Sequence, residues 1–147
     1  MLAGSDISGS VRPQLEFEVL TDLGIFVVYH SGGAPSQPAW EAFIARLRSS
    51  GGEMRCLVYT EGWYPTRAQA SQITQARRGK QPTIAVLSTA TSVQFAVSVF
   101  ALVNRRMRFF KPEELDQAFV HLGLQPSAGA RVREALARLQ AKPSSAR

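Results

Sequence analysis

The side chains best suited to acid–base or metal chemistry do not combine into a known kind of site in this sequence. His30 and His121 are far apart in the chain, and neither has a cysteine, histidine or carboxylate at the spacing of a metal site. Glu113 and Glu114 are adjacent, but they follow Pro112 in the first turn of a predicted helix, where carboxylates stabilise the helix dipole. Glycine-rich phosphate loops and the Gly-x-Ser-x-Gly turn of hydrolases do not occur. We therefore expect no catalytic residue, no metal and no cofactor.

Aromatic and hydroxyl side chains gather in two loops that each follow a predicted strand. Residues 61–66 include Trp63 and Tyr64, and residues 88–92 are rich in hydroxyls. We expect both loops at the carboxyl ends of neighbouring strands, where open α/β sheets usually bind ligands. Trp and Tyr are frequent interface anchors, although both side chains would also be explained by packing back onto the core. The predicted partner-binding residues are Trp63, Tyr64, Thr66, Arg67, Ser88, Thr89 and Thr91.

A second candidate site is basic. The net charge is +6, and it is unevenly distributed: residues 1–74 carry 5 Lys or Arg against 7 Asp or Glu, whereas residues 75–147 carry 12 against 4. Two clusters, 77–80 and 105–108, lie at the C-terminal ends of predicted helices, where cations are also explained by the helix dipole. Converging clusters would bind phosphate backbones or acidic lipids. The predicted anion-binding residues are Arg77, Arg78, Lys80, Arg105, Arg106 and Arg108.

The elements that must position these residues alternate between strands and helices. Apolar residues alternate with acidic ones over 15–19 and are continuous over 25–29, which predicts an antiparallel hairpin. The predicted strands cover 15–19, 25–29, 54–59, 83–87 and 107–110, and the predicted helices cover 38–48, 66–78, 91–103, 112–122 and 128–141. This order predicts an α/β fold, a mixed sheet with an N-terminal hairpin and helices packed on it.

Two of the predicted helices begin with the spacing of a capping box. Thr66 precedes Gln69 by three residues, and Thr91 precedes Gln94 in the same way. The helix after Thr91 is apolar almost all round over residues 93–103. We therefore expect this helix either to be largely buried or to offer one apolar face to a partner.

Length and composition indicate one domain. A chain of 147 residues with 45% apolar and 19% charged residues can bury a core without metal or disulfide support. We expect a domain over 14–141, with flexible segments at 1–13 and 142–147. The sequence contains no signal-like N-terminus and no apolar run long enough to span a membrane, and its single Cys56 cannot pair within the chain. A cytoplasmic protein with a buried structural thiol is the expectation.

The stretch 108–124, which reads RFFKPEELDQAFVHLGL, places a short aromatic strand before a Pro-Glu-Glu-Leu-Asp-x-Ala helix that closes on Leu-Gly. With it, the chain over 15–124 resembles the STAS-like, SpoIIAA-like domains of bacteria. The resemblance implies a protein-binding role, because known members are anti-sigma-factor antagonists that are phosphorylated in an Asp-Ser-Ser-Gly-type motif after the third strand. Residues 60–67 lack that motif, and only Thr66 would replace its acceptor hydroxyl, a role that competes with helix capping.

These observations lead to a ranked set of functions. The first is a non-enzymatic interaction module, regulatory or scaffolding, that binds another protein or a second copy through Trp63 and Tyr64 or through the helix over 95–103. The second is an electrostatic binder of nucleic acid or an anionic membrane through the arginine clusters. The third is a lipid or small-molecule binding module, because related lipid-binding folds enclose an apolar pocket beneath comparable helices. An enzyme has the least support.

Overall fold

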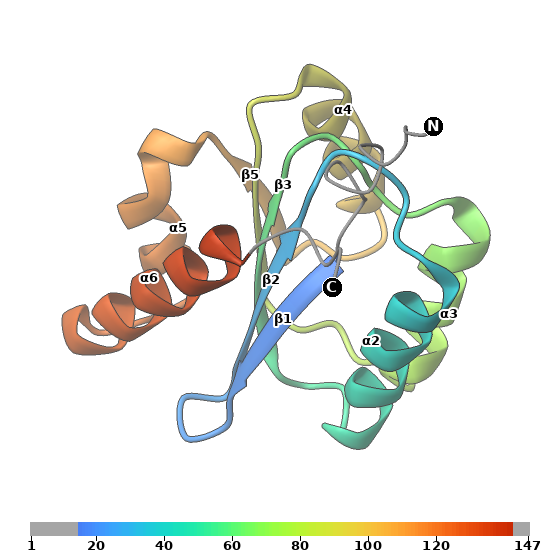
Figure 1. Ribbon diagram of the computed structural model, residues 1–147, viewed down its shortest axis with the longest axis horizontal. Coiled ribbons are helices and arrows are strands. Elements are labelled where there is room, and N and C mark those ends of the chain that lie inside the picture. The colour runs from blue at the N-terminus through green and yellow to red at the C-terminus, as the bar shows by residue number, and fades with distance from the viewer. Residues whose placement is uncertain (1–14, 143–147) are drawn as a thin grey trace, which may run out of the picture.

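A five-stranded mixed sheet forms the centre of the computed structural model, which describes residues 15–142 (Figure 1). The strands lie side by side in chain order, with the first antiparallel to the second and all later neighbours parallel. They are β1 (Leu15–Leu20), β2 (Ile25–His30), β3 (Arg55–Thr60), β4 (Ile84–Leu87) and β5 (Met107–Phe110). The predicted α/β class, the N-terminal hairpin and the mixed sheet are confirmed.

Helices cover both faces of this sheet (Figure 1). One face carries α2 (Gln37–Ser49), α3 (Arg67–Ala76) and α4 (Thr91–Phe100), and the other carries the short 3₁₀ helix η1 (Pro112–Glu114), α5 (Leu115–His121) and α6 (Pro126–Ala141). Each parallel strand is added beside the preceding one, always in the same direction. Right-handed crossovers therefore place α2, α3 and α4 on one face.

Each face of the sheet has its own apolar core. Alternate residues of β2 point to opposite faces, so that Phe26 and Val28 join the core beneath α2, α3 and α4, whereas Ile25 and Val27 join the core beneath α5 and α6. All four side chains are buried, which explains why β2 is a continuous apolar run rather than an alternating one.

Helix capping follows the prediction at one helix and departs from it at another. Thr66 caps α3: its Oγ1 accepts a hydrogen bond from the Gln69 amide at 3.1 Å, and Gln69 Oε1 accepts one from the Thr66 amide at 3.0 Å. The capping box predicted for Thr91 and Gln94 is wrong. The Gln94 amide donates to the carbonyl of Ala90, which is the N-cap residue, so that Thr91 is already the first residue of α4.

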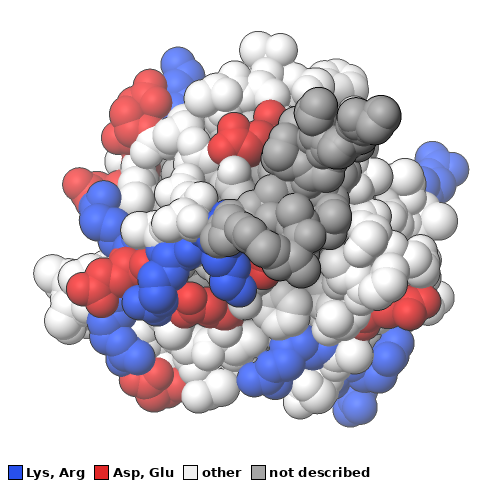
Figure 2. Space-filling view, in the orientation of Figure 1, with Lys and Arg blue, Asp and Glu red and all other residues white. Residues whose placement is uncertain are grey.

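Three basic side chains of α6 and its C-cap pair with acidic side chains of the N-terminal hairpin, which accounts for part of the charge asymmetry of the sequence. The pairs are Arg131 with Asp22, Arg138 with Glu18, and Lys142 with Glu16. Figure 2 shows acidic and basic side chains interleaved over α5 and α6. Lys142 was expected in the flexible tail and instead makes one of these contacts, whereas the segments 1–13 and 143–147 lie outside the described residues.

Candidate ligand-binding cavity

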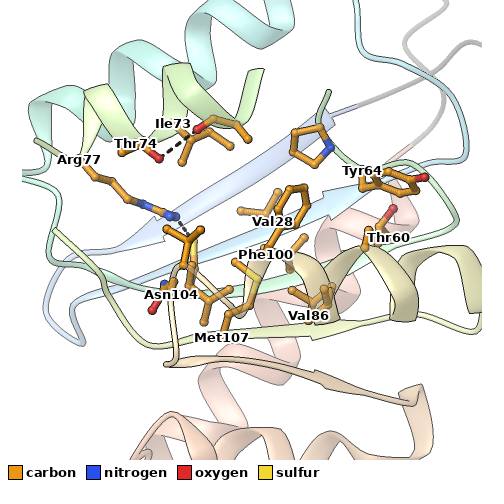
Figure 3. Close-up of a pocket in the computed structure, with 18 of the residues that line it drawn as sticks. Val28, Thr60, Tyr64, Ile73, Thr74, Arg77, Val86, Phe100, Asn104 and Met107 are labelled. Carbon is orange, nitrogen blue, oxygen red and sulfur yellow. Dashed lines mark hydrogen bonds between the residues drawn. The ribbon is translucent and has the colours of Figure 1, made fainter. Parts of the chain in front are cut away.

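A cavity of about 300 Å³ lies between α3 and α4, above the parallel strands of the sheet (Figure 3). Its floor consists of apolar side chains from three neighbouring strands, including Val28, Cys56, Val58 and Val86. Ile73 of α3 and Phe100 of α4 form its two sides. This size and this apolar lining are typical of small-molecule sites in proteins.

The cavity exists because α3 does not fill the space beneath it. The stripe of α3 that faces the sheet contains Ala70, Ile73, Thr74 and Arg77, at the i, i+3, i+4 and i+7 spacing of one helix face. Two of these side chains are short, and Ala76 is the only buried residue of α3. As a result Val58, on the central strand, stays only half-buried.

Aromatic side chains close the end of the cavity at the carboxyl ends of the strands. The ring of Trp63 packs on the buried ring of His30 with 4.3 Å between centroids, and it meets Trp40 edge-on at 6.0 Å. Thr60 fixes the loop, because its Oγ1 donates to the Trp63 carbonyl at 2.7 Å and accepts from the Gly62 amide at 3.2 Å. This end is therefore built mainly from ring faces.

The opposite end contains a cation. Arg77 is half-buried and points into the cavity, where its Nη2 lies 3.6 Å from Cys56 Sγ (Figure 3). Burial raises the pKa of the Cys56 thiol, and the nearby guanidinium offsets only part of that rise. The buried free thiol expected from the sequence is confirmed. At neutral pH it is a neutral thiol beside a permanently charged arginine.

The predicted partner-binding residues divide into exposed and internal ones. Tyr64 is 42% exposed although it also lines the cavity, and Arg67, Thr89 and Thr91 are exposed. Ser88 is fully buried, and its Oγ accepts a hydrogen bond from the Ala90 amide, so it does not belong to the surface. Trp63 is half-buried against the aromatic rings and Thr66 is the helix cap. The two loops do begin side by side, because β3 and β4 are parallel neighbours.

The loops that carry the two predicted anion-binding clusters are joined by hydrogen bonds at the basic end of the cavity. The Gln81 side chain donates to the Val103 carbonyl at 2.8 Å, and the Asn104 side chain donates to the Pro82 carbonyl at 3.1 Å. The fold thus brings the two loops together although they are more than 20 residues apart in the sequence.

Individual cations in these clusters have different surroundings. Lys80 pairs with Glu53 at 2.8 Å, whereas Arg78, Arg105 and Arg106 are exposed and make no ion pair with any residue of the range 15–142. Arg108 lies apart from the others. Its guanidinium is 5.7 Å from the Phe110 ring, whose side chain belongs to the core on the opposite face of the sheet.

The outer face of α4 is apolar and exposed. Phe95 is 72% exposed, Val99 47% and Leu102 80%. They follow one another at spacings of four and three residues, about one helical turn each, on one side of α4 and of the turn after it. The inner face, with Val93, is buried. The sequence left open whether this helix is buried or offers an apolar face to a partner. In the structure one face of the helix packs in the core and the other face is apolar and exposed.

The sequence interpretation included an apolar pocket among its alternatives but did not place it between α3 and α4. Its signal was the stripe 70, 73, 74 and 77, in which an arginine occupies an inward position and two neighbours are too short to reach the sheet. Arg77 is predicted from the sequence as an anion-binding residue at the end of the helix, with the helix dipole as the alternative explanation, and not as a residue inside a cavity. The predicted position at the helix end and the observed position in the cavity differ only in the side of the helix that Arg77 faces.

Comparison of the chain with protein-family models, with curated proteins and with solved structures gives no match. Between residues 15 and 142, no three His, Cys, Asp or Glu side chains are grouped closely enough to hold a metal ion. None of the helices in that range has the length and apolar character needed to cross a membrane.

Proposed function

We propose that the protein is a non-enzymatic binding module and that the cavity between α3 and α4 binds an apolar small molecule. The observation that carries this proposal is the cavity of about 300 Å³, walled by valine, isoleucine and phenylalanine side chains and closed at one end by packed aromatic rings. Filling it would remove exposed apolar surface from water, at roughly 25 cal/mol per Å². An apolar ligand therefore fits the site better than a polar one.

The chemistry of the lining supports binding rather than catalysis. Cys56 is the only nucleophilic thiol, and burial keeps it protonated. His30 also lines the cavity, but it is buried and packs against the Trp63 ring. The hydroxyl of Thr60 donates to the Trp63 carbonyl and that of Thr74 to the Ala70 carbonyl, so neither hydroxyl proton is directed at a side chain that could act as a general base.

We place the fold with the STAS-like, SpoIIAA-like domains as part of this proposal. The strands in chain order, the hairpin start and the 3₁₀ turn at Pro112 that leads into α5 support the assignment. A cytoplasmic location likewise stays a prediction, supported by the single unpaired cysteine.

A cavity-filling pair of variants tests the proposal. Ala70 lines the cavity, whereas Ala68 is exposed on the same helix, so Ala70→Phe and Ala68→Phe add the same atoms in different places. We expect the wild type and Ala68→Phe to bind 1-decanol in calorimetric titration with equal affinity, and Ala70→Phe to bind at least about tenfold more weakly. Equal binding by all three proteins, or no binding by the wild type, would contradict the proposal.

The exposed face of α4 favours a second candidate function, the protein-interaction module expected from the sequence. Phe95 and Leu102 are large apolar side chains on one exposed stripe, and such patches on folded proteins mark interaction sites. A partner protein would cover this stripe. Light scattering and pull-down with Phe95→Ser and Leu102→Ser should show loss of a complex that Val120→Ser retains, since Val120 is equally exposed on the opposite face. A complex unaffected by all three changes would exclude α4 as the interface.

A further inference from the structure

The cavity contains one charge that the protein does not balance. Arg77 lines the cavity, yet no carboxylate in the range 15–142 lies within ion-pair distance of its guanidinium. Other arginines of this chain, such as Arg131 and Arg138, do pair with acidic side chains. A half-buried cation beside apolar walls is unfavourable without a partner, which makes Arg77 an exception that requires explanation.

The neighbours of Arg77 do not satisfy its hydrogen-bonding capacity. A guanidinium has five N–H donors, and within residues 15–142 the only acceptor that the Arg77 side chain meets is Cys56 Sγ, a weak acceptor, at 3.6 Å. Asn104 at the same end is already engaged on both sides, because its Oδ1 accepts from the Arg106 amide and its Nδ2 donates to Pro82. Lys80, the other cation in the lining, pairs with Glu53, so Arg77 is the cavity cation without a carboxylate partner among residues 15–142.

The charge lies at one extremity of an elongated apolar space. Figure 3 shows Arg77 at one end, beside Asn104 and Met107, and Tyr64 and Thr60 at the other, with Val28, Val86 and Phe100 between them. A molecule that fills this space would present one end to the guanidinium and the remainder to apolar side chains. The site therefore suits an amphiphile, a ligand with a polar head group and an apolar chain.

We propose that the ligand of this cavity is a long-chain carboxylate whose head group pairs with Arg77 and whose alkyl chain extends toward Tyr64. The inference rests on the proposed function, since it names the class of ligand for the same cavity. A carboxylate suits an arginine because its two oxygens accept two parallel N–H bonds from the planar guanidinium. The alkyl chain accounts for the apolar walls.

The test compares two ligands of equal chain length and two arginines that are adjacent in sequence. Decanoate and 1-decanol differ only in the head group, and Arg77→Met removes the cavity cation while Arg78→Met removes an exposed one. At neutral pH we expect the wild type to bind decanoate about tenfold more tightly than decanol, the usual scale of a charged hydrogen bond. Arg78→Met should keep this preference, and Arg77→Met should lose it while still binding decanol.

Each remaining outcome decides a separate point. Equal affinity of the wild type for decanoate and decanol would overturn the carboxylate proposal and leave the apolar site in place. A decanoate preference that survives in Arg77→Met would also overturn it. Failure of the wild type to bind either ligand would overturn the proposed function together with the inference. Should Arg77→Met fail to fold in a thermal melt, Arg77→Lys replaces it, with a reduced preference expected because lysine lacks the bidentate fork.

Discussion

At the scale of single residues, the placement of Arg77 depends on a close backbone contact. Gly52 has a φ of +85°, and a Cβ atom at this position would lie 2.4 Å from the Arg77 carbonyl oxygen. Gly51 has nearly the same φ, +87°, but no atom lies within 4 Å of its Cβ position. The loop before β3 thus touches the end of α3 at a point where only glycine fits.

This contact gives a prediction with an internal control. Gly52→Ala combines an unfavourable φ with a backbone clash, whereas Gly51→Ala has the unfavourable φ alone. We expect losses in the free energy of unfolding of about 3 kcal/mol and about 1 kcal/mol respectively, measured by urea denaturation. Equal losses would show that the approach of Gly52 to Arg77 is not tight.

A tyrosine on the other face of the sheet predicts how stability changes with pH. Burial, together with the nearby carboxylate of Glu61, raises the pKa of Tyr29 to about 12, and its hydroxyl donates to Glu61 Oε2 at 3.1 Å. The unfolded chain loses this proton near pH 10, before the folded one does. The stabilisation is therefore complete below about pH 10 and is lost as the pH rises toward 12.

The measurement is a pair of pH titrations. Absorbance titration of the folded protein should show a tyrosine that ionises near pH 12 and that is missing in Tyr29→Phe. Urea midpoints should fall between pH 10 and 12 more steeply for the wild type than for Tyr29→Phe. Identical pH profiles of the two proteins would show that Tyr29 does not carry the effect.

At the scale of elements, Thr66 and Thr91 both lie at helix starts, but only Thr66 makes a capping hydrogen bond. Thr66→Ala removes a hydrogen bond to the Gln69 amide and should lower the free energy of unfolding by about 1 kcal/mol. Thr91→Ala removes no capping bond, because Ala90 is the N-cap of α4, and should change stability by less than half as much. Thermal or urea denaturation of both variants checks the difference, and equal losses would argue against the structural assignment of the α4 start.

The elements themselves could be predicted from the sequence, since their signals are local. The alternation over 15–19, the apolar run over 25–29 and the Thr66 cap each depend on residues a few positions apart. The Gly123 stop of α5 is similar: Gly123 has a φ of +71°, and the Leu124 amide reaches the Phe119 carbonyl at 3.0 Å.

The cavity could not be predicted in the same way because it depends on distances between elements. Whether Ala70 and Thr74 leave a gap is decided by how far α3 stands from the sheet, and α2 and the Gly52 contact set that distance. The inward direction of Arg77 follows from helix phase, which a residue type at a helix end does not reveal. The wrong prediction of a Thr91 cap has the same origin, since the chain enters α4 one residue earlier than its hydroxyl pattern indicates.

At the scale of the whole molecule, the distribution of charge defines where an anionic partner would bind. The cations of α6 pair with acids of the hairpin and of α5. Arg78, Arg105 and Arg106 make no ion pair within residues 15–142, and they lie in the hydrogen-bonded loops at the basic end of the cavity. Any binding of nucleic acid or anionic vesicles should therefore weaken steeply with salt and depend on these arginines. Salt-independent binding would point to the apolar face of α4 instead.

The most direct test of the ligand-binding cavity uses the two tryptophans of the chain. Trp40 and Trp63 are the only ones in the sequence, and both line the cavity. Titration with decanol or decanoate should therefore change the tryptophan emission saturably, with one ligand per chain, in the wild type and in Ala68→Phe but not in Ala70→Phe. Calorimetric binding without any change in emission, or an equal change in Ala70→Phe, would place the ligand outside the cavity and contradict the proposal.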